Sequence, residues 1–172
     1  MNLLGSSRCF CKKEESCIIE FMEKIKFSIV IVNYYSGLLT KACIQSVRRS
    51  CDRDDYEIFV VDNDSHDDSR EILTSEVENV RVKFTGKNLG YAKAVNIALN
   101  ETRGEYIILL NPDIIVLKDG INELLKFMDS HPKAGIAGGQ LINPNGTIQE
   151  SAFRFYQPMT ILYRRTFFRH LP

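Results

Sequence analysis

The chain is 172 residues long, 44% of its residues are hydrophobic, and its 22 basic and 22 acidic side chains cancel. This length suits one domain that buries enough apolar surface to fold without disulfides or a structural metal. The balance excludes a strongly basic nucleic-acid-binding protein, and no apolar run reaches the ~18 residues that cross a bilayer. The charge is unevenly distributed, because residues 151–172 carry +4 and the first 150 residues carry −4.

The first residues of the chain are predicted to form a leader that precedes the folded domain. Cys9, Cys11 and Cys17 lie there without the spacing of a zinc site. An odd total of five cysteines and the lack of a secretory signal predict reduced thiols and a cytoplasmic protein. We therefore expect a leader over residues 1–24, a folded domain over residues 25–150 and a basic, aromatic tail over residues 151–172.

Strand-like and helix-like segments then alternate. Residues 27–32 are a nearly continuous β-branched run, typical of a strand buried on both faces. In the next segment Leu39, Cys43, Ile44 and Val47 recur at helical spacing. The predicted strands are 27–32, 58–61, 80–84, 106–110 and 136–141, and the predicted helices are 36–49, 67–77, 91–101 and 119–130. The pair Asn145-Gly146 favours a hairpin turn. This order predicts an α/β fold, a Rossmann-like and mostly parallel sheet flanked by helices.

Polar residues follow three of these strands. They are Asn33-Tyr34-Tyr35, Asp62-Asn63 and Asn111-Pro112-Asp113. Ligands of parallel α/β sheets bind at the carboxyl ends of the strands, so these residues predict a binding site. There is no GxGxxG sequence, no phosphate-binding loop of the Walker A type and no catalytic pairing for the three histidines.

Two carboxylates of this site suggest chemistry. Asp62 is suited to accept hydrogen bonds from a nucleobase or ribose, although Asp62 and Asn63 also suit a turn cap. Asp113, which we expect at the end of a central strand, is suited to hold Mg²⁺ or Mn²⁺ through one oxygen while a diphosphate completes the shell. The alternative for Asp113 is a simple turn residue that precedes a helix.

The segment from Asn88 to Asn96 is the most distinctive part of the sequence. Gly90 and two alanines stand at a predicted helix start, where a backbone approaches a ligand closely and anions are favoured. Lys93 is long enough to reach a phosphate or a ribose.

Together these motifs resemble the inverting family 2 glycosyltransferases of GT-A fold, and most closely the rhamnosyltransferase-like branch that builds cell-surface polysaccharide. The resemblance runs from about Lys26 to the end of the chain. It rests on four stretches in order, namely 28–34, 60–65, 88–92 and 111–113. It implies that Asp62 reads a pyrimidine and that Asp113 contacts a divalent cation, with Asn111 in place of the family's first acidic residue. The implied donor-binding residues are Val32, Asn33, Tyr34, Asp62, Asn63, Asn88, Gly90, Lys93 and Asn111.

The resemblance also implies the reaction. A nucleoside-diphosphate sugar, with dTDP-rhamnose as the first guess, would donate its sugar with inversion to a saccharide or lipid-linked saccharide acceptor. The family's general base comes from a later part of its chains, and Asp129 and Glu150 do not lie in its motif. We therefore expect a donor-binding half or a truncated reading frame.

An alternative is a catalytically inactive module that binds nucleotides or associates with membranes. Basic, aromatic segments bind anionic membrane surfaces, so this alternative includes peripheral contact at the inner face of the plasma membrane.

Overall fold

The computed structural model describes residues 24–151. The predicted leader and tail lie outside the described residues, apart from Lys24 and Ser151 at their edges. The chain divides between Asn122 and Glu123 into two units. None of the helices in the described range is long and apolar enough to cross a membrane.

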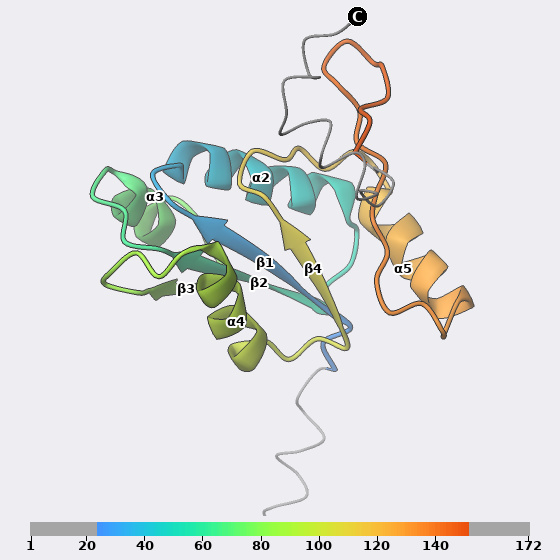
Figure 1. The fold of residues 1–172 in the computed structure, drawn as a ribbon, viewed down its shortest axis with the longest axis horizontal. Helices are drawn as coiled ribbons and strands as arrows, with labels where there is room; N and C mark the ends of the chain where they lie inside the picture. The colour runs from blue at the N-terminus through green and yellow to red at the C-terminus, as the bar shows by residue number, and fades with distance from the viewer. Residues whose placement is uncertain (1–23, 152–172) are drawn as a thin grey trace, which may run out of the picture. The chain divides into compact units, whose positions relative to one another are not determined.

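The first unit contains a sheet of four parallel strands in the order β3-β2-β1-β4 (Figure 1). The strands are β1 (Phe27–Asn33), β2 (Tyr56–Asp62), β3 (Arg81–Phe84) and β4 (Tyr106–Leu110). The helices that follow them are α2 (Gly37–Ser50), α3 (Ser69–Ser75), α4 (Tyr91–Glu101) and α5 (Gly120–Ser130). The predicted alternation of four strands with four helices is confirmed.

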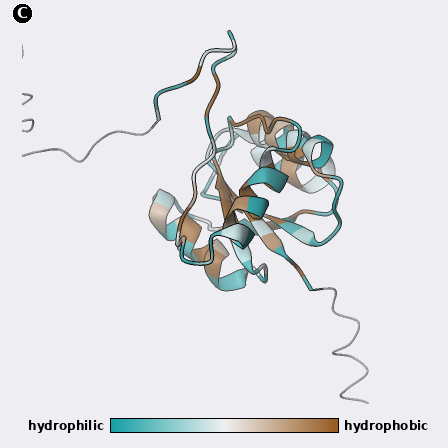
Figure 2. Cartoon of the chain, turned by 90° about the vertical axis from the view of Figure 1, so that its right-hand side faces the viewer, coloured by the Kyte–Doolittle hydropathy of each residue, from teal (hydrophilic) through white to brown (hydrophobic). Residues whose placement is uncertain are grey.

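Both faces of β1 are buried, as its β-branched sequence predicts. Successive strand residues point to opposite faces, so Val30 and Val32 face one helix layer and Ile29 and Ile31 face the other. The first layer is α4, whose small residues allow it to lie close to the sheet. The apolar cluster there consists of Val30, Val32, Phe59, Val61, Ala94, Val95 and Ala98. Figure 2 shows hydrophobic residues along the strands, and both hydrophobic and hydrophilic residues on the helices.

The second layer is formed by α2 and α3, on the opposite face of the sheet from α4 (Figure 1). Cys43, Ile44 and Val47 of α2 are buried as expected. Leu39, the fourth apolar residue at this helical spacing, is 52% exposed, and Thr40 is buried in its place. Thr40 turns inward because its hydroxyl donates a hydrogen bond to the side chain of Asn33, 2.8 Å away.

The prediction that Asp113 follows a central strand is also wrong. In the described part of the chain β4 pairs with β1 alone and forms one edge of the sheet. Ile107 and Leu109, two residues apart on β4, point to the same face of the sheet and are exposed.

The predicted strand over residues 136–141 does not form. These residues are irregular, and a single antiparallel bridge joins Ile142 to Ile148. Gly138 and Gly139 weaken any strand there, since glycine has the largest backbone entropy to lose and no side chain to pack. The predicted turn at Asn145-Gly146 is confirmed, with Gly146 at φ +82°.

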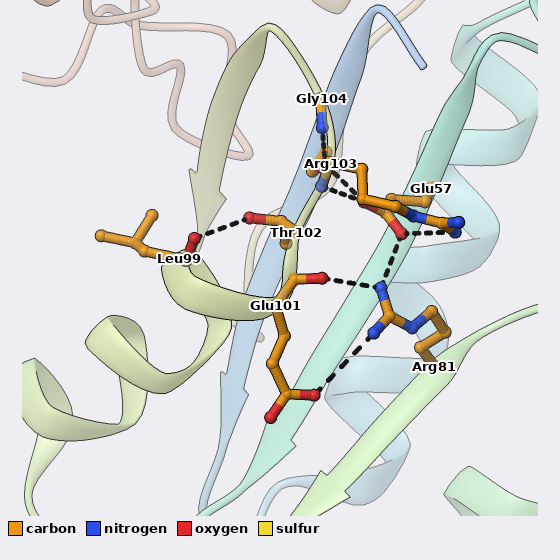
Figure 3. Close-up of polar contacts among 8 residues, drawn as sticks. Glu57, Arg81, Leu99, Glu101, Thr102, Arg103 and Gly104 are labelled. Atoms are coloured by element: carbon orange, nitrogen blue, oxygen red, sulfur yellow. Dashed lines mark hydrogen bonds and ion pairs between the residues drawn. The ribbon is translucent and has the colours of Figure 1, made fainter. Parts of the chain in front are cut away.

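At the amino end of the sheet, Glu57 of β2 connects neighbouring segments through hydrogen bonds (Figure 3). Its carboxylate accepts hydrogen bonds from the Ser28 hydroxyl at 2.8 Å, the Arg103 amide N–H at 2.6 Å and the Arg81 guanidinium at 2.9 Å. Burial by itself raises the pKa of Glu57, but the hydrogen bonds outweigh it and the pKa is lowered overall. The connection from α4 to β4 is thereby held against the strands.

Candidate functional site

The candidate site lies at the carboxyl edge of the sheet, where the chain changes direction. From β1 the chain builds β2 and β3 on one side, and it then returns to add β4 on the other side. In such sheets ligands bind at this switch point. Asn33, Asp62 and Asn111 come at the carboxyl ends of β1, β2 and β4, and Asn33 lies directly opposite Asp62 in the register of the two strands.

The side chain of Asn33 is buried, and protein atoms satisfy it completely. Its Nδ2 donates to Asp62 Oδ2 at 2.7 Å and to Ser65 Oγ at 3.1 Å. Its Oδ1 accepts from the hydroxyls of Thr40 at 2.8 Å and Ser36 at 3.1 Å. A primary amide offers two donors and two acceptor positions, so none is left for a ligand.

Asp62 is 2% exposed, and two neutral donors hold its carboxylate. Oδ2 accepts from Asn33, and Oδ1 accepts from the amide N–H of Ser65 at 3.0 Å. A carboxylate has about four acceptor positions, so two remain. The Asp62 carbonyl also accepts the amide N–H of Thr85 at 3.0 Å, which ties the loop after β3 to the end of β2.

Asn63 is buried beside Asp62 and holds the same loop. Its Nδ2 donates to Asn88 Oδ1 at 3.0 Å, and its Oδ1 accepts the amide N–H of Leu89 at 2.9 Å. Asn88 Oδ1 also accepts from the Gly90 amide at 2.9 Å. Two donors on one oxygen fix the orientation of the Asn88 amide, so the exposed Asn88 side chain keeps its NH₂ group for another partner.

Two residues with positive φ shape the loops after β1 and β2. Tyr35 has φ +53° and Asp64 has φ +73°. The hydroxyl of Ser65 joins the loops, because it accepts the Tyr35 amide N–H at 2.9 Å and the Asn33 amide at 3.1 Å. Residues other than glycine adopt this conformation at a cost, and such strain clusters at functional sites.

The aromatic side chains at the end of β1 are accessible. Tyr34 and Tyr35 are each 48% exposed, and their rings meet edge to face with centroids 4.7 Å apart. The ring of Tyr35 lies 6.3 Å from that of His66. Val32, by contrast, lies in the apolar cluster against α4 and is 7% exposed.

The start of α4 presents Gly90 and Lys93. Gly90 has φ +80° and ψ +156°, a combination essentially restricted to glycine, and a Cβ there would meet no atom within 4 Å. The conformation of the backbone therefore requires this glycine, whereas crowding does not. Lys93 is exposed and has no ion pair with any of residues 24–151.

The segment after β4 runs beside α2 (Figure 1). The Cys43 thiol donates to the Asn111 carbonyl at 3.7 Å, and the Ser46 hydroxyl accepts the Val116 amide N–H at 2.9 Å. Burial and the nearby Asp113 charge raise the pKa of Cys43 to about 11, so this thiol stays protonated and able to donate. Asn111 and Asp113 themselves are exposed.

The oxygen atoms at this segment suit a metal site that is shared with a ligand. Among residues 24–151 no three His, Cys, Asp or Glu side chains are grouped as metal ligands. Mg²⁺ and Mn²⁺ favour oxygen atoms, and Mg²⁺ is commonly held by one or two carboxylates together with substrate phosphates. The Asp113 carboxylate and the Asn111 amide oxygen fit this second kind of site.

Sequence reasoning located the strand-end residues but missed the hydroxyls that hold them. Ser36, Thr40 and Ser65 are the partners of Asn33, and none of them was a candidate. The one available signal was a serine three residues after Asp62, because Asp side chains often accept a nearby downstream amide.

The sequence is similar to that of known proteins. Residues 28–171 match the profile of the family described as glycosyl transferase family 2. An N-acetylglucosaminyl-diphospho-decaprenol L-rhamnosyltransferase of Mycobacterium tuberculosis is 30% identical over 135 residues, 72% of this chain and 44% of that protein. A poly(ribitol-phosphate) beta-glucosyltransferase of Bacillus spizizenii is 32% identical over 140 residues, 78% of this chain and 22% of that protein.

The fold is also found in solved structures. The structure of S. aureus TarS 1-349 in complex with UDP superposes with a TM-score of 0.56 and 26% sequence identity, covering 62% of this chain and 33% of that chain. The chain thus spans less than half the length of each of these three proteins.

Proposed function

Because this chain belongs to glycosyl transferase family 2 and has the GT-A fold, we propose that it binds a nucleoside-diphosphate sugar at the carboxyl edge of the sheet. The sugar then passes with inversion to a saccharide or lipid-linked saccharide acceptor. The observation that carries the proposal is the hydrogen-bonded group of Asn33, Asp62, Asn63 and Asn88 at the switch point. The name of one relative, an L-rhamnosyltransferase, supports rhamnose as the sugar, and we take dTDP-rhamnose as the first donor to test.

The proposed site has a suitable side chain for each part of the donor. The carboxylate of Asp62 accepts a hydrogen bond from a base N–H, and the exposed ring of Tyr34 offers a stacking surface. The NH₂ group of Asn88 and the ammonium of Lys93 are donors, as the oxygen atoms of a ribose and a diphosphate require.

The metal belongs to the diphosphate end of the proposed site. Asp113, with Asn111 beside it, would hold Mg²⁺ or Mn²⁺. When bound, this ion supplies positive charge that stabilises the departing nucleoside diphosphate. The contacts of the segment with α2 support this proposal, because they hold the backbone at Asn111 and at Val116, on both sides of Asp113.

Nucleotide binding is the first test. We expect UDP or dTDP to bind the full chain, and Asp62→Asn to weaken the binding about tenfold to a hundredfold, because an acceptor of a charge-assisted hydrogen bond is lost. Isothermal titration calorimetry measures both, and Glu78→Ala is the control because Glu78 is exposed and lies outside the site. Failure of the wild-type chain to bind either nucleotide would contradict the proposal.

Metal dependence is the second test. We expect Mn²⁺ to tighten the binding of UDP or dTDP by the wild type, and Asp113→Ala to remove this effect while binding without metal stays similar. Titrations with and without Mn²⁺ measure the difference, with Glu78→Ala again as the control for loss of an exposed carboxylate. An unchanged Mn²⁺ effect in Asp113→Ala would exclude this residue as a ligand.

Turnover separates an enzyme from a binding module. Transfer or hydrolysis of the sugar nucleotide by the full chain is expected for the proposed function. Binding without either reaction would instead support the inactive module.

A further inference from the structure

Asn33 lies at the centre of the site, but its own side-chain atoms are not available to bind a ligand. Its side chain has no exposed surface, and its amide is saturated by Asp62, Ser65, Ser36 and Thr40. The residue therefore acts on its neighbours, and the neighbour with chemical consequence is Asp62.

The Asp62 carboxylate is held without being neutralised. In the described part of the chain no basic side chain pairs with it, and its donors are the Asn33 amide and the Ser65 N–H. A lysine or arginine in place of Asn33 would have fixed the carboxylate but cancelled its charge. A neutral amide fixes the carboxylate and leaves it a strong acceptor.

The orientation of the Asn33 amide is set by hydroxyls in α2 and in the residue before it. The hydroxyl of Thr40 donates to Oδ1, which forces the NH₂ group toward Asp62. The hydroxyl of Ser36 donates to the same oxygen, although it also lies 3.3 Å from the Tyr34 carbonyl. The Thr40 hydroxyl donates to Asn33, whereas the Ser36 hydroxyl is shared between two acceptors. The hydrogen bonds therefore run in one direction, from Thr40 through Asn33 to Asp62.

We infer that Asn33 and Thr40 are positioning residues, which orient the Asp62 carboxylate toward the base of the donor without touching the donor. The inference rests on the proposed function, since it assigns a task to Asp62 that only a bound nucleotide would use. It departs from the expectation that Asn33 lines the base-binding surface.

The first experiment replaces Asn33 by Asp, which has nearly the same shape. Two carboxylates at hydrogen-bond distance cannot both ionise readily, so they share one proton at low pH and lose it at high pH. We expect UDP or dTDP to bind Asn33→Asp at least tenfold more weakly than the wild type at pH 8, and within about threefold of it at pH 5.5, because the shared proton restores the hydrogen bond.

The wild type is the control for every other titrating group. Asp64, His66 and Asp67 lie in the loop after β2, and Asp113 follows β4. Ser36, which precedes α2, and Thr40 in α2 contact Asn33 through hydroxyls. These groups and the nucleotide phosphates are the same in both proteins. The ratio of the two dissociation constants therefore isolates position 33, and thermal melting at each pH verifies that both proteins are folded.

The second experiment uses Thr40, which has no contact with the ligand in this inference. We expect Thr40→Val, which keeps the shape and loses the hydroxyl, to weaken nucleotide binding about threefold to tenfold. Thr40→Ser, which keeps the hydroxyl, should bind like the wild type.

The outcomes distinguish the inference from the proposed function. No binding by the wild type overturns both. Wild-type binding together with an Asn33→Asp ratio that is independent of pH, or with equal losses in Thr40→Val and Thr40→Ser, overturns the positioning role alone.

Discussion

Gly104→Ala is expected to lower the free energy of unfolding by about 3 kcal/mol, the upper end of ordinary overpacking effects. Gly104 lies where the connection from α4 to β4 crosses the start of β1 (Figure 3). A Cβ at this position would lie against the amide nitrogen of Ser28 and 2.7 Å from the Cα of Phe27. Backbone atoms cannot move aside as a flexible side chain can, and the bond from the Gly104 N–H to the Ser28 hydroxyl at 2.9 Å would be strained as well.

Urea denaturation monitored by circular dichroism measures this effect as a lower midpoint at unchanged slope. Gly138→Ala is the matched control, because a Cβ there would meet no atom within 4 Å and its φ is not positive. We expect a change within about 0.5 kcal/mol for the control. Equal effects of the two substitutions would show that Gly104 is not required by close packing.

Glu57→Gln is expected to lower the free energy of unfolding by about 2 kcal/mol at pH 7, because a charged acceptor of several hydrogen bonds becomes a neutral amide with a misplaced donor. The side chain of Glu57 is 8% exposed, so solvent replaces little of what is lost. The pKa of Glu57 is lowered in the folded protein. Its stabilising contribution is therefore present above the unfolded pKa near 4.3 and is lost as the pH falls through the lower folded value.

Denaturation at several pH values from 7 down to 3.5 tests the expected convergence of the wild type and Glu57→Gln. Glu101→Gln is the control, because Glu101 is more exposed and pairs with Lys83 at the surface, where ion pairs contribute little. A difference between the wild type and Glu57→Gln that stays constant over this range would contradict the role of the charge.

The order of elements could be predicted because it depends on patterns along the chain. Features that depend on contacts between distant residues could not. β2 begins at Tyr56, two residues before the predicted start, because Tyr56 pairs with Phe27 across the strands and their rings stack 5.2 Å apart. The edge position of β4 and the burial of Thr40 in place of Leu39 are likewise properties of the folded state.

In the candidate site, too, some features could be predicted from the sequence and others could not. Asp62 and Asn63 could be found from their place after a buried strand, and the structure brings both to the carboxyl edge of the sheet. Whether an amide is exposed or saturated cannot be seen in a sequence, because the partners of Asn33 lie as far away as Ser65. Asn33 and Asn63 prove to be buried, whereas Asn88, Lys93 and Asn111 are exposed.

Helix α2 touches both ends of the site, through Thr40 at Asn33 and through Cys43 at Asn111. Thr40 and Cys43 are about 4.5 Å apart along the helix axis, since a helix rises 1.5 Å per residue. A rigid helix therefore fixes the spacing between Asn33 at the end of β1 and Asn111 at the end of β4. If the proposed donor binds across this spacing, we expect a nucleoside monophosphate and a nucleoside triphosphate of the same base to bind less tightly than the diphosphate.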